Sequence, residues 1–354
     1  MKELSEVLNF EQPTKYIVKN ENYSDSYSTP VLTAGKTFIK GYTNETEGIY
    51  PANKLPVIIF DDFTTASKYV DFPFKVKSSA MKILSAKNDS INIKYIYYAM
   101  QNIKFNSTTH KRYWISQYCH EKINIPSLEI QNKIVDQLEK IETAIKLKKQ
   151  QYEYFSCLEN NLFIDMFGDR YNNDKNWETK KLKDVACFRN GKAHEKVVDE
   201  NGNYILITSK AISSDLLDVR KTSENLSPLF KNEIVMVMSD LPNGRALAKC
   251  FLVDSDDKYT LNQRICAFSD FDCNPIYLKF LLNRHEYFLN FDDKNSQTNL
   301  RKDDILNCDL IIPPLELQNK FGKIIDNIEK NKINIVNGID FLEDLLTKQV
   351  NNLF

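Results

Sequence analysis

The sequence is poor in the residues that build most catalytic and cofactor sites. It has nine glycines among 354 residues, none spaced GxGxxG, so a glycine-rich turn for a dinucleotide or a methyl donor is not expected. Its seven cysteines never form a CxxC pair, and its four histidines share no metal-ligand spacing. We therefore predict no metal, no cofactor and no disulfide framework.

Long apolar runs and a strong net charge are also missing. No stretch approaches the roughly 18 consecutive apolar residues of a membrane span, and the start MKELSEVLNF lacks a signal-peptide pattern, which favours a cytoplasmic protein without a membrane partner. The net charge of −1 argues against coating nucleic acid through bulk charge. Residues 1–127 carry 16 basic and 12 acidic side chains, whereas residues 171–312 carry 20 and 22. High affinity for DNA would therefore need help from attached subunits.

One segment superficially resembles a nucleotide-hydrolysis site. Ala34-Gly35-Lys36-Thr37 is followed by Val57-Ile58-Ile59-Phe60-Asp61-Asp62, like a phosphate loop and a metal-binding strand. The first glycine of such a loop would fall on Pro30, which has no N–H to offer a phosphate. We predict no catalytic residues here or elsewhere in the chain.

An internal repeat runs through the whole chain. Residues 125–133, IPSLEIQNK, recur as residues 312–320, IPPLELQNK, with seven of nine positions identical. Weaker likenesses upstream of each copy keep the same order, for example KELSEV at 2–7 and KKLKDV at 180–185. The chain therefore alternates globular region, helix, globular region, helix.

Each repeated block opens a narrow apolar stripe. Stepping alternately by four and three residues from Ile134, and again from Phe321, meets eight apolar side chains in ten positions. This spacing is typical of a coiled-coil seam, and it predicts two helices of about 35 residues that pair with each other. The first helix leads into the second globular region and the second helix leaves it. We therefore expect an antiparallel pair with the globular regions at opposite ends and the carboxyl terminus near the first region.

The globular regions combine short strands with helices. Apolar runs at 57–60, 204–207 and 234–238 predict strands, and residues 93–101 and 275–283 predict helices. The predicted fold class is α+β, with an approximate twofold repeat and four parts: a globular region at 1–125, a long helix at 126–168, a second globular region at 169–312 and a second long helix at 313–354.

Several loops combine basic, amide and hydroxyl side chains with apolar or aromatic neighbours. Arginine can pair with guanine and asparagine or glutamine with adenine, and all of them can hold phosphates. Each cluster alone is also compatible with a solvated loop. The candidate DNA contacts are Lys36, Thr64, Thr65, Lys68, His110, Lys111, Arg112, Tyr113 and Trp114 in the first region, and Lys192, Ser209, Lys210, Arg245, Gln263, Arg264, Asn299 and Arg301 in the second.

The whole chain resembles the specificity subunit of a type I restriction-modification system. The resemblance rests on the repeated Pro-x-Leu-Glu helix start, the exit FIDMFGD at 163–169, the re-entry at Trp177-Glu178 with Leu182, and VIIFDD followed by KYVDFPF at 68–74. It implies two target-recognition domains that read the two halves of a split site in double-stranded DNA. It also implies two methyltransferase (M) subunits and restriction (R) subunits, which perform the chemistry.

The leading hypothesis is thus a non-catalytic DNA reader and assembly scaffold. Two alternatives remain at this point: an enzyme that modifies DNA unaided, and a coiled-coil adaptor that never binds nucleic acid. Methyl transfer by the pure chain would favour the first alternative, and absence of sequence-dependent binding with methyltransferase partners would favour the second.

Overall fold

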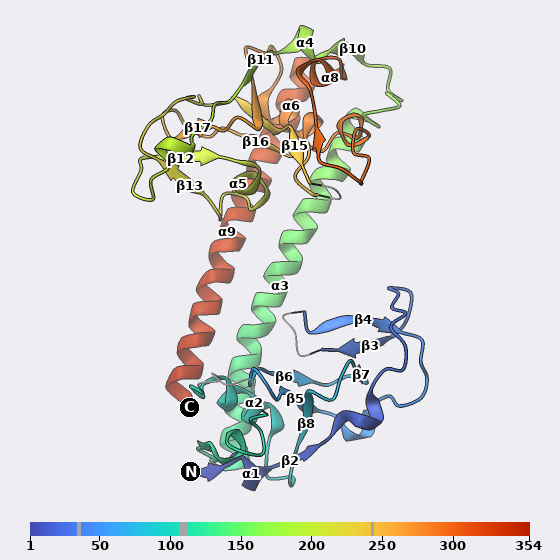
Figure 1. Ribbon diagram of the computed structural model, residues 1–354, viewed down its shortest axis with the longest axis vertical. Helices are drawn as coiled ribbons and strands as arrows, with labels where there is room; N and C mark the ends of the chain where they lie inside the picture. The colour runs from blue at the N-terminus through green and yellow to red at the C-terminus, as the bar shows by residue number, and fades with distance from the viewer. Residues whose placement is uncertain (34–36, 106–111, 242–243) are drawn as a thin grey trace. The chain divides into compact units, whose positions relative to one another are not determined.

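The computed structural model describes residues 1–33, 37–105, 112–241 and 244–354 (Figure 1). It divides into two compact units, Met1–Gln150 with Val336–Phe354, and Gln151–Ile335. Each unit thus contains one globular region and a part of both long helices. The predicted division into four parts by residue number stays a prediction.

The first unit is built from two small sheets and a short ribbon. A four-stranded antiparallel sheet has the order β2-β8-β5-β6, and a three-stranded sheet has the order β4-β3-β7 with β3 and β7 parallel. The strands are β1 (Lys2–Glu3), β2 (Leu8–Glu11), β3 (Thr29–Leu32), β4 (Ile39–Thr43), β5 (Val57–Asp61), β6 (Ser67–Val70), β7 (Lys75–Val76), β8 (Met81–Ala86) and β9 (Lys122–Ile123), with β1 paired to β9. The helices are α1 (Leu4–Val7), α2 (Ile93–Gln101) and the 3-10 turns η1 (Pro13–Tyr16), η2 (Ala52–Lys54) and η3 (Tyr118–His120).

The second unit repeats this topology. Its four-stranded sheet has the order β11-β18-β14-β16, and its three-stranded sheet β13-β12-β17 again contains one parallel pair. The strands are β10 (Glu178–Lys181), β11 (Cys187–Asn190), β12 (Tyr204–Ile207), β13 (Arg220–Thr222), β14 (Ile234–Val237), β15 (Ser239–Asp240), β16 (Cys250–Leu252), β17 (Tyr259–Leu261), β18 (Ile265–Ser269), β19 (Thr298–Asn299) and β20 (Asp309–Ile312). The helices are α4 (Leu182–Val185), α5 (Ser209–Ser213), α6 (Pro275–Leu282), α7 (Glu286–Leu289), α8 (Lys302–Leu306) and the turn η4 (Glu195–Val197).

The central strand of each unit is buried on both faces. Because successive side chains of a strand point to opposite faces, Ile58 and Phe60 of β5 join the cluster around α2, while Val57 and Ile59 join the core between the two sheets. β14 repeats the pattern: Ile234 and Met236 face the cluster around α6, and its two valines face the other core. Burial on both faces explains why both strands read as continuous apolar runs.

The two long helices, α3 (Leu128–Phe167) and α9 (Leu315–Leu353), pair in both units. In the second unit the ring of Phe163 meets that of Phe321 edge to face and Glu159 binds Lys332, so residue numbers fall along α3 as they rise along α9. In the first unit Lys149 binds Glu343, and Val350 packs in one cluster with Leu138, which again gives an antiparallel pair. All ten predicted seam positions of each helix are buried or half-buried, which confirms the predicted stripes.

The repeated Gln-Asn of each helix start docks the helix on its globular region. Gln131 is fully buried, its amide oxygen accepts the backbone N–H of Asn92 at 2.9 Å, and its amide nitrogen donates to the carbonyls of Ser90 and Pro126. Gln318 makes the equivalent bonds, to the N–H of Asn274 at 2.9 Å and to the carbonyl of Pro313. Asn92 and Asn274 are the N-cap residues of α2 and α6. The glutamine of the motif therefore joins a long helix to a short one in each unit.

We expect Gln131→Ala to destabilise the first unit by roughly 3 kcal/mol. The change leaves one backbone N–H and two carbonyls without their partner, and each unsatisfied buried group costs about 1–3 kcal/mol. Urea unfolding measures the effect, with Gln137→Ala, at an exposed position of the same helix, as the control. Equal midpoints for the two variants would contradict this role of the amide.

Candidate nucleic-acid interface

A hollow of about 270 Å³ on the second unit gathers polar side chains from four segments. The predicted contacts Ser209, Lys210, Gln263 and Arg264 all line it. Ser209 and Lys210 are the first two residues of α5, and Gln263 and Arg264 lie in the turn between β17 and β18. The other lining residues are Glu195, Thr208, Arg220 and Asn262. The hollow thus unites residues that the sequence analysis had found in separate clusters.

Four of these lining residues are not among the predicted contacts: Thr208 and Asn262 directly precede predicted ones, whereas Arg220 and Glu195 lie on other segments. Arg220 comes from β13 and Glu195 from η4. Arg220 is followed by Lys221 and Thr222, and this basic and hydroxyl run is a signal that could have pointed to it. An acidic side chain is not expected in a loop that approaches phosphates, and therefore no signal pointed to Glu195.

A buried histidine ties the two main segments of the hollow together. The Nδ1 of His194 lies 2.7 Å from the carbonyl of Lys192, and its Nε2 lies 2.7 Å from the hydroxyl of Thr260. Because a carbonyl only accepts, Nδ1 carries the proton, and a neutral imidazole then accepts the Thr260 hydroxyl proton at Nε2. The backbone N–H of Lys192 adds a bond to the carbonyl of Leu261 at 3.0 Å. The predicted contact Lys192 is exposed at the edge of this junction.

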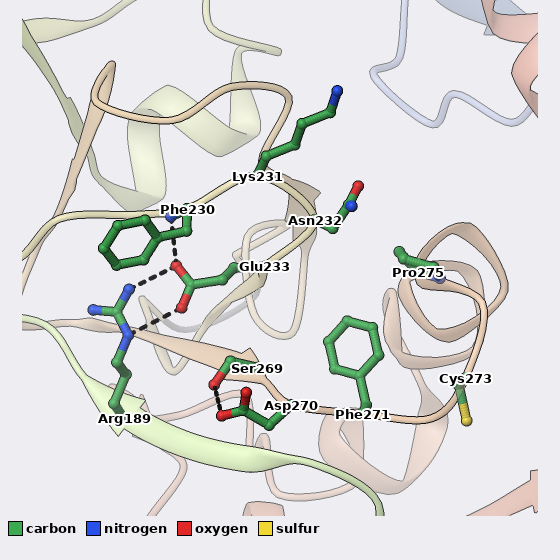
Figure 2. A pocket seen from close by; sticks show the side chains of 10 residues that line it. All are labelled: Arg189, Phe230, Lys231, Asn232, Glu233, Ser269, Asp270, Phe271, Cys273 and Pro275. Carbon is green, nitrogen blue, oxygen red and sulfur yellow. Dashed lines mark hydrogen bonds and ion pairs between the residues drawn. The ribbon is translucent and has the colours of Figure 1, made fainter.

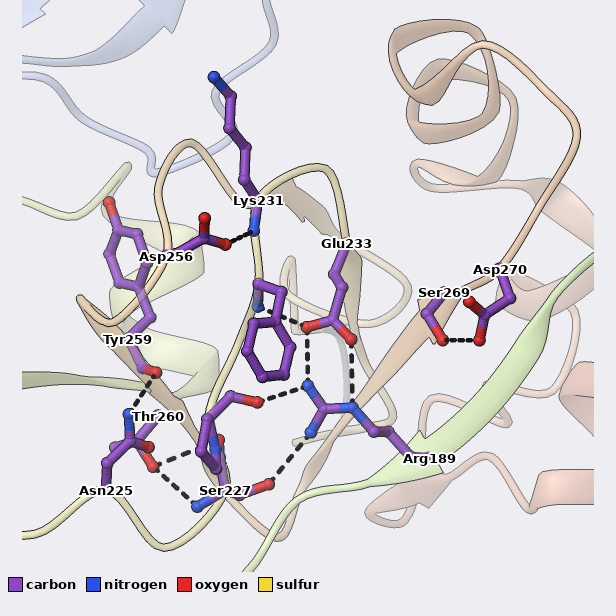
Figure 3. Close-up of polar contacts among 12 residues, drawn as sticks. Arg189, Asn225, Ser227, Lys231, Glu233, Asp256, Tyr259, Thr260, Ser269 and Asp270 are labelled. Carbon is purple, nitrogen blue, oxygen red and sulfur yellow. Dashed lines mark hydrogen bonds and ion pairs between the residues drawn. The ribbon is translucent and has the colours of Figure 1, made fainter.

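The arginine next to this segment supports the fold instead of facing outward. Arg189 makes a two-pronged ion pair with Glu233 and donates to the hydroxyl of Ser227 and the carbonyl of Pro228 (Figures 2 and 3). The N–H of Ser227 in turn donates to Thr260, the partner of His194. These contacts form a connected network from Arg189 through Ser227 and Thr260 to His194, the neighbour of the lining residue Glu195. Figure 2 shows the Arg189 pair at one side of a larger hollow of about 670 Å³, which Phe230 and Phe271 also line.

Two further predicted contacts, Asn299 and Arg301, lie on a segment that is joined to the hollow by backbone hydrogen bonds. The N–H of Met238 donates to the carbonyl of Arg264 at 3.2 Å, and the carbonyl of Met238 accepts the N–H of Leu300 at 2.8 Å. Asn299 and Arg301 flank Leu300 and are exposed. At about 4.8 Å between neighbouring strands, the backbone segments of Arg264, Met238 and Leu300 span on the order of 10 Å, close to the roughly 12 Å width of the DNA major groove.

Arg245 lies in a loop that a carboxylate organises. Asp240, the last residue of β15, accepts the N–H of Ala246 at 2.6 Å and that of Leu247 at 3.0 Å. β15 pairs with β19, in which Ser239 lies opposite Asn299. The exposed Arg245 is therefore held on the same strand end as Asn299.

In the first unit two adjacent carboxylates organise the corresponding loops. Asp61 ends β5 and accepts the hydroxyl of Thr64 and the N–H of Phe63, which shapes the turn that carries the predicted contacts Thr64 and Thr65. Thr65 has a φ of 61°, an uncommon conformation for a β-branched residue. Lys68 is exposed on the following strand, β6. The Asp61-Asp62 pair thus has a structural role in shaping these loops.

Asp62 holds the second loop of the first unit. Its N–H donates to the carbonyl of Ala80 and its carbonyl accepts the N–H of Tyr113, the same two bonds that Met238 makes in the second unit. One carboxylate oxygen also accepts the N–H of Trp114 at 2.8 Å, and the other pairs with Lys82 at 2.9 Å. The exposed Arg112 directly precedes this anchored segment.

The side chains of Tyr113 and Trp114, two of the predicted DNA contacts, lie in the core of the first unit, and their contact with DNA stays a prediction. Their side chains are only 3% and 2% exposed, and Trp114 packs its ring 5.1 Å from that of Phe60. Large aromatic rings fill the core beside α2. Because the residues next to them in the sequence are polar, the sequence did not reveal that these rings are buried. The predicted contacts Lys36, His110 and Lys111 lie outside the described residues.

Two absences concern the described part of the chain. Within residues 1–33, 37–105, 112–241 and 244–354, no group of three or more His, Cys, Asp or Glu side chains could hold a metal ion. Over the same ranges no helix combines the length and the apolar character that crossing a bilayer requires.

Comparison with known proteins identifies the family of the chain. The family described as type I restriction modification DNA specificity domain matches residues 1–154 and 174–340. The chain belongs to this family. The two matched stretches agree with the internal repeat. The predicted family is confirmed.

A curated relative supports the same family assignment. The type I restriction enzyme EcoR124I/EcoR124II specificity subunit of Escherichia coli is 51% identical over 169 residues, which are 43% of this chain and 42% of that protein. The chain therefore matches less than half of the length of this curated relative.

Solved structures share the fold over the full length. The type I restriction-modification S subunit from M. genitalium has a TM-score of 0.62 at 14% identity, covering 100% of this chain and 95% of its own. A chain from a structure described as explaining complex assembly and conformational transition of the type I R-M system has a TM-score of 0.55 at 13% identity, covering 98% and 97%. The predicted fold class, two mixed α/β regions with a pair of long antiparallel helices, is confirmed.

Proposed function

We propose that this specificity protein reads a bipartite target in double-stranded DNA, with one half-site for each globular region. One observation carries the proposal. After the central strand of each unit, Asp62 or Met238 makes the same two backbone bonds, and the loops with predicted DNA contacts lie beside it. A repeated fold thus offers two equivalent edges with different side chains, as reading two unlike half-sites requires.

The chemistry in this proposal belongs to partners. The chain acts in the cytoplasm as a non-catalytic scaffold for two methyltransferase subunits and for restriction subunits, in line with the family. Paired long helices join the two regions, and the repeated Gln-Asn docking gives each region the same connection to its helix. Two copies of one partner can therefore bind equivalently.

We expect an exchange of residues 1–127 for those of another family member to change one half-site of the target only. The contacts of the second region are unaltered by the exchange, so its half-site stays the same. Mapping of methylated DNA in cells that carry the chimaera and methyltransferase subunits measures both half-sites together. Changes in both half-sites would contradict the proposed division of the reading.

The two alternatives give different results. An enzyme that modifies DNA unaided would incorporate methyl groups as the pure chain, and an adaptor would show no sequence-dependent binding even with methyltransferase subunits present. The proposal predicts neither result.

A further inference from the structure

Glu195 and Gln263 face each other across the hollow of the second unit. The amide nitrogen of Gln263 donates to a carboxylate oxygen of Glu195 at 3.3 Å. An ionised carboxylate only accepts hydrogen bonds, so it must meet the nitrogen end of the amide. This contact fixes the orientation of the Gln263 side-chain amide. In that orientation its carbonyl oxygen and its second N–H can bind a ligand.

The two segments that carry this pair are firmly joined. His194, the neighbour of Glu195, is 1% exposed and binds Lys192 and Thr260. Gly191 approaches the other segment so closely that an added Cβ would lie 2.2 Å from the carbonyl oxygen of Asn262. The side chain of Asn262 also accepts the N–H of Arg264, which shapes the turn around Gln263. The two backbone segments that carry the pair are thus joined by buried contacts beneath it.

The surroundings of the pair fit the edge of a DNA base. Arg220 and Arg264 line the same hollow, and in the described part of the chain neither has a carboxylate within ion-pair distance. These guanidinium groups suit phosphates or guanine. The carboxylate of Glu195 is repelled by phosphates, and it accepts a hydrogen bond from Gln263.

We propose that Glu195 is a positioning residue that makes Gln263 read an adenine in the half-site of the second region. In the amide orientation fixed by Glu195, the carbonyl oxygen of Gln263 accepts a hydrogen bond from the N6 amine of adenine, and its free N–H donates to N7. Without Glu195, both N–H bonds of the Gln263 amide are free to donate to the O6 and N7 acceptors of guanine. Glu195 therefore selects adenine over guanine. This inference rests on the proposed function.

The test is the selection of randomised duplex DNA by the full chain assembled with its methyltransferase subunits. The unaltered chain is expected to require adenine at one position of the second half-site. Gln263→Ala is expected to lose the preference at that position. Glu195→Ala is expected to accept guanine there as well, with adenine preference reduced about tenfold. Glu200→Ala removes the same charge from an exposed neighbouring position, and it is expected to leave the preference intact.

Three results would overturn the inference alone: adenine preference that survives Glu195→Ala, a Gln263-dependent position that is not adenine, or a uniform loss of affinity at every position in Glu195→Ala. The last would indicate a purely structural role. Preserved reading of the remaining positions shows that each variant is folded. If the unaltered chain selects no sequence at all, the proposed function fails and the inference fails with it.

Discussion

Lys82→Met is expected to lower the free energy of unfolding of the first unit by about 3–5 kcal/mol. Lys82 and Asp62 form an ion pair at 2.9 Å with side chains only 1% and 2% exposed. Removing one partner leaves the other charge buried and uncompensated, which is among the costliest single changes in a protein core. Denaturant unfolding followed by tryptophan fluorescence measures the loss, because Trp114 binds the same carboxylate.

Two further variants test the cause of this loss. Lys133→Met breaks the exposed pair with Glu129 and is expected to change stability by less than about 1 kcal/mol. Adding Asp62→Asn to Lys82→Met is expected to recover much of the stability, because the neutral amide removes the buried charge and still accepts the N–H of Trp114. A double variant as unstable as Lys82→Met would show that the lost packing of Lys82, and not the stranded charge, causes the effect.

Gly191→Ala is expected to abolish reading of the second half-site while the first half-site is still read. A Cβ at this position would lie 2.2 Å from the carbonyl oxygen of Asn262 and 2.5 Å from that of Leu261. Both atoms belong to the backbone, so no side-chain rotation relieves the collision and the two segments must separate. Separation breaks the Lys192–Leu261 bond and opens the hollow.

Binding of the assembled complex to its target measures this effect, with Ala193→Ser at an exposed neighbouring position as the control. We expect the affinity of Gly191→Ala for the full target to fall at least about tenfold, since at least one bidentate base contact is lost. Equal affinities for the two variants would place the hollow outside the DNA contact.

The long helices show how far pattern alone can lead. Their spacing of apolar residues predicted two paired helices, because a narrow stripe on a long helix needs an equally long partner. The polar seam residues Glu159 and Lys332 had no explanation in that pattern. In the second unit they meet at 2.7 Å, and the charge of each compensates the burial of the other. Which residue lies opposite which is a property of the helix register.

The loops show where pattern misleads. Arg112 and Trp114 look like one basic and aromatic cluster, yet Arg112 is exposed and Trp114 is buried. A local sequence does not reveal which side of a loop faces the core, because Asp62, some 50 residues away in the chain, holds the backbone there. Glu195 escaped notice for a similar reason, since its partner Gln263 lies on another segment.

The sequence by itself determined the repeat, the two helical stripes, the central strands and the family, because each is written in local periodicity or in recurring motifs. The tertiary structure alone decided which polar side chains gather at one edge. Hydrogen bonds between distant strands join Lys192 to Leu261 and Met238 to both Arg264 and Leu300. Such pairings depend on sheet register, and register follows from the packing of the whole unit.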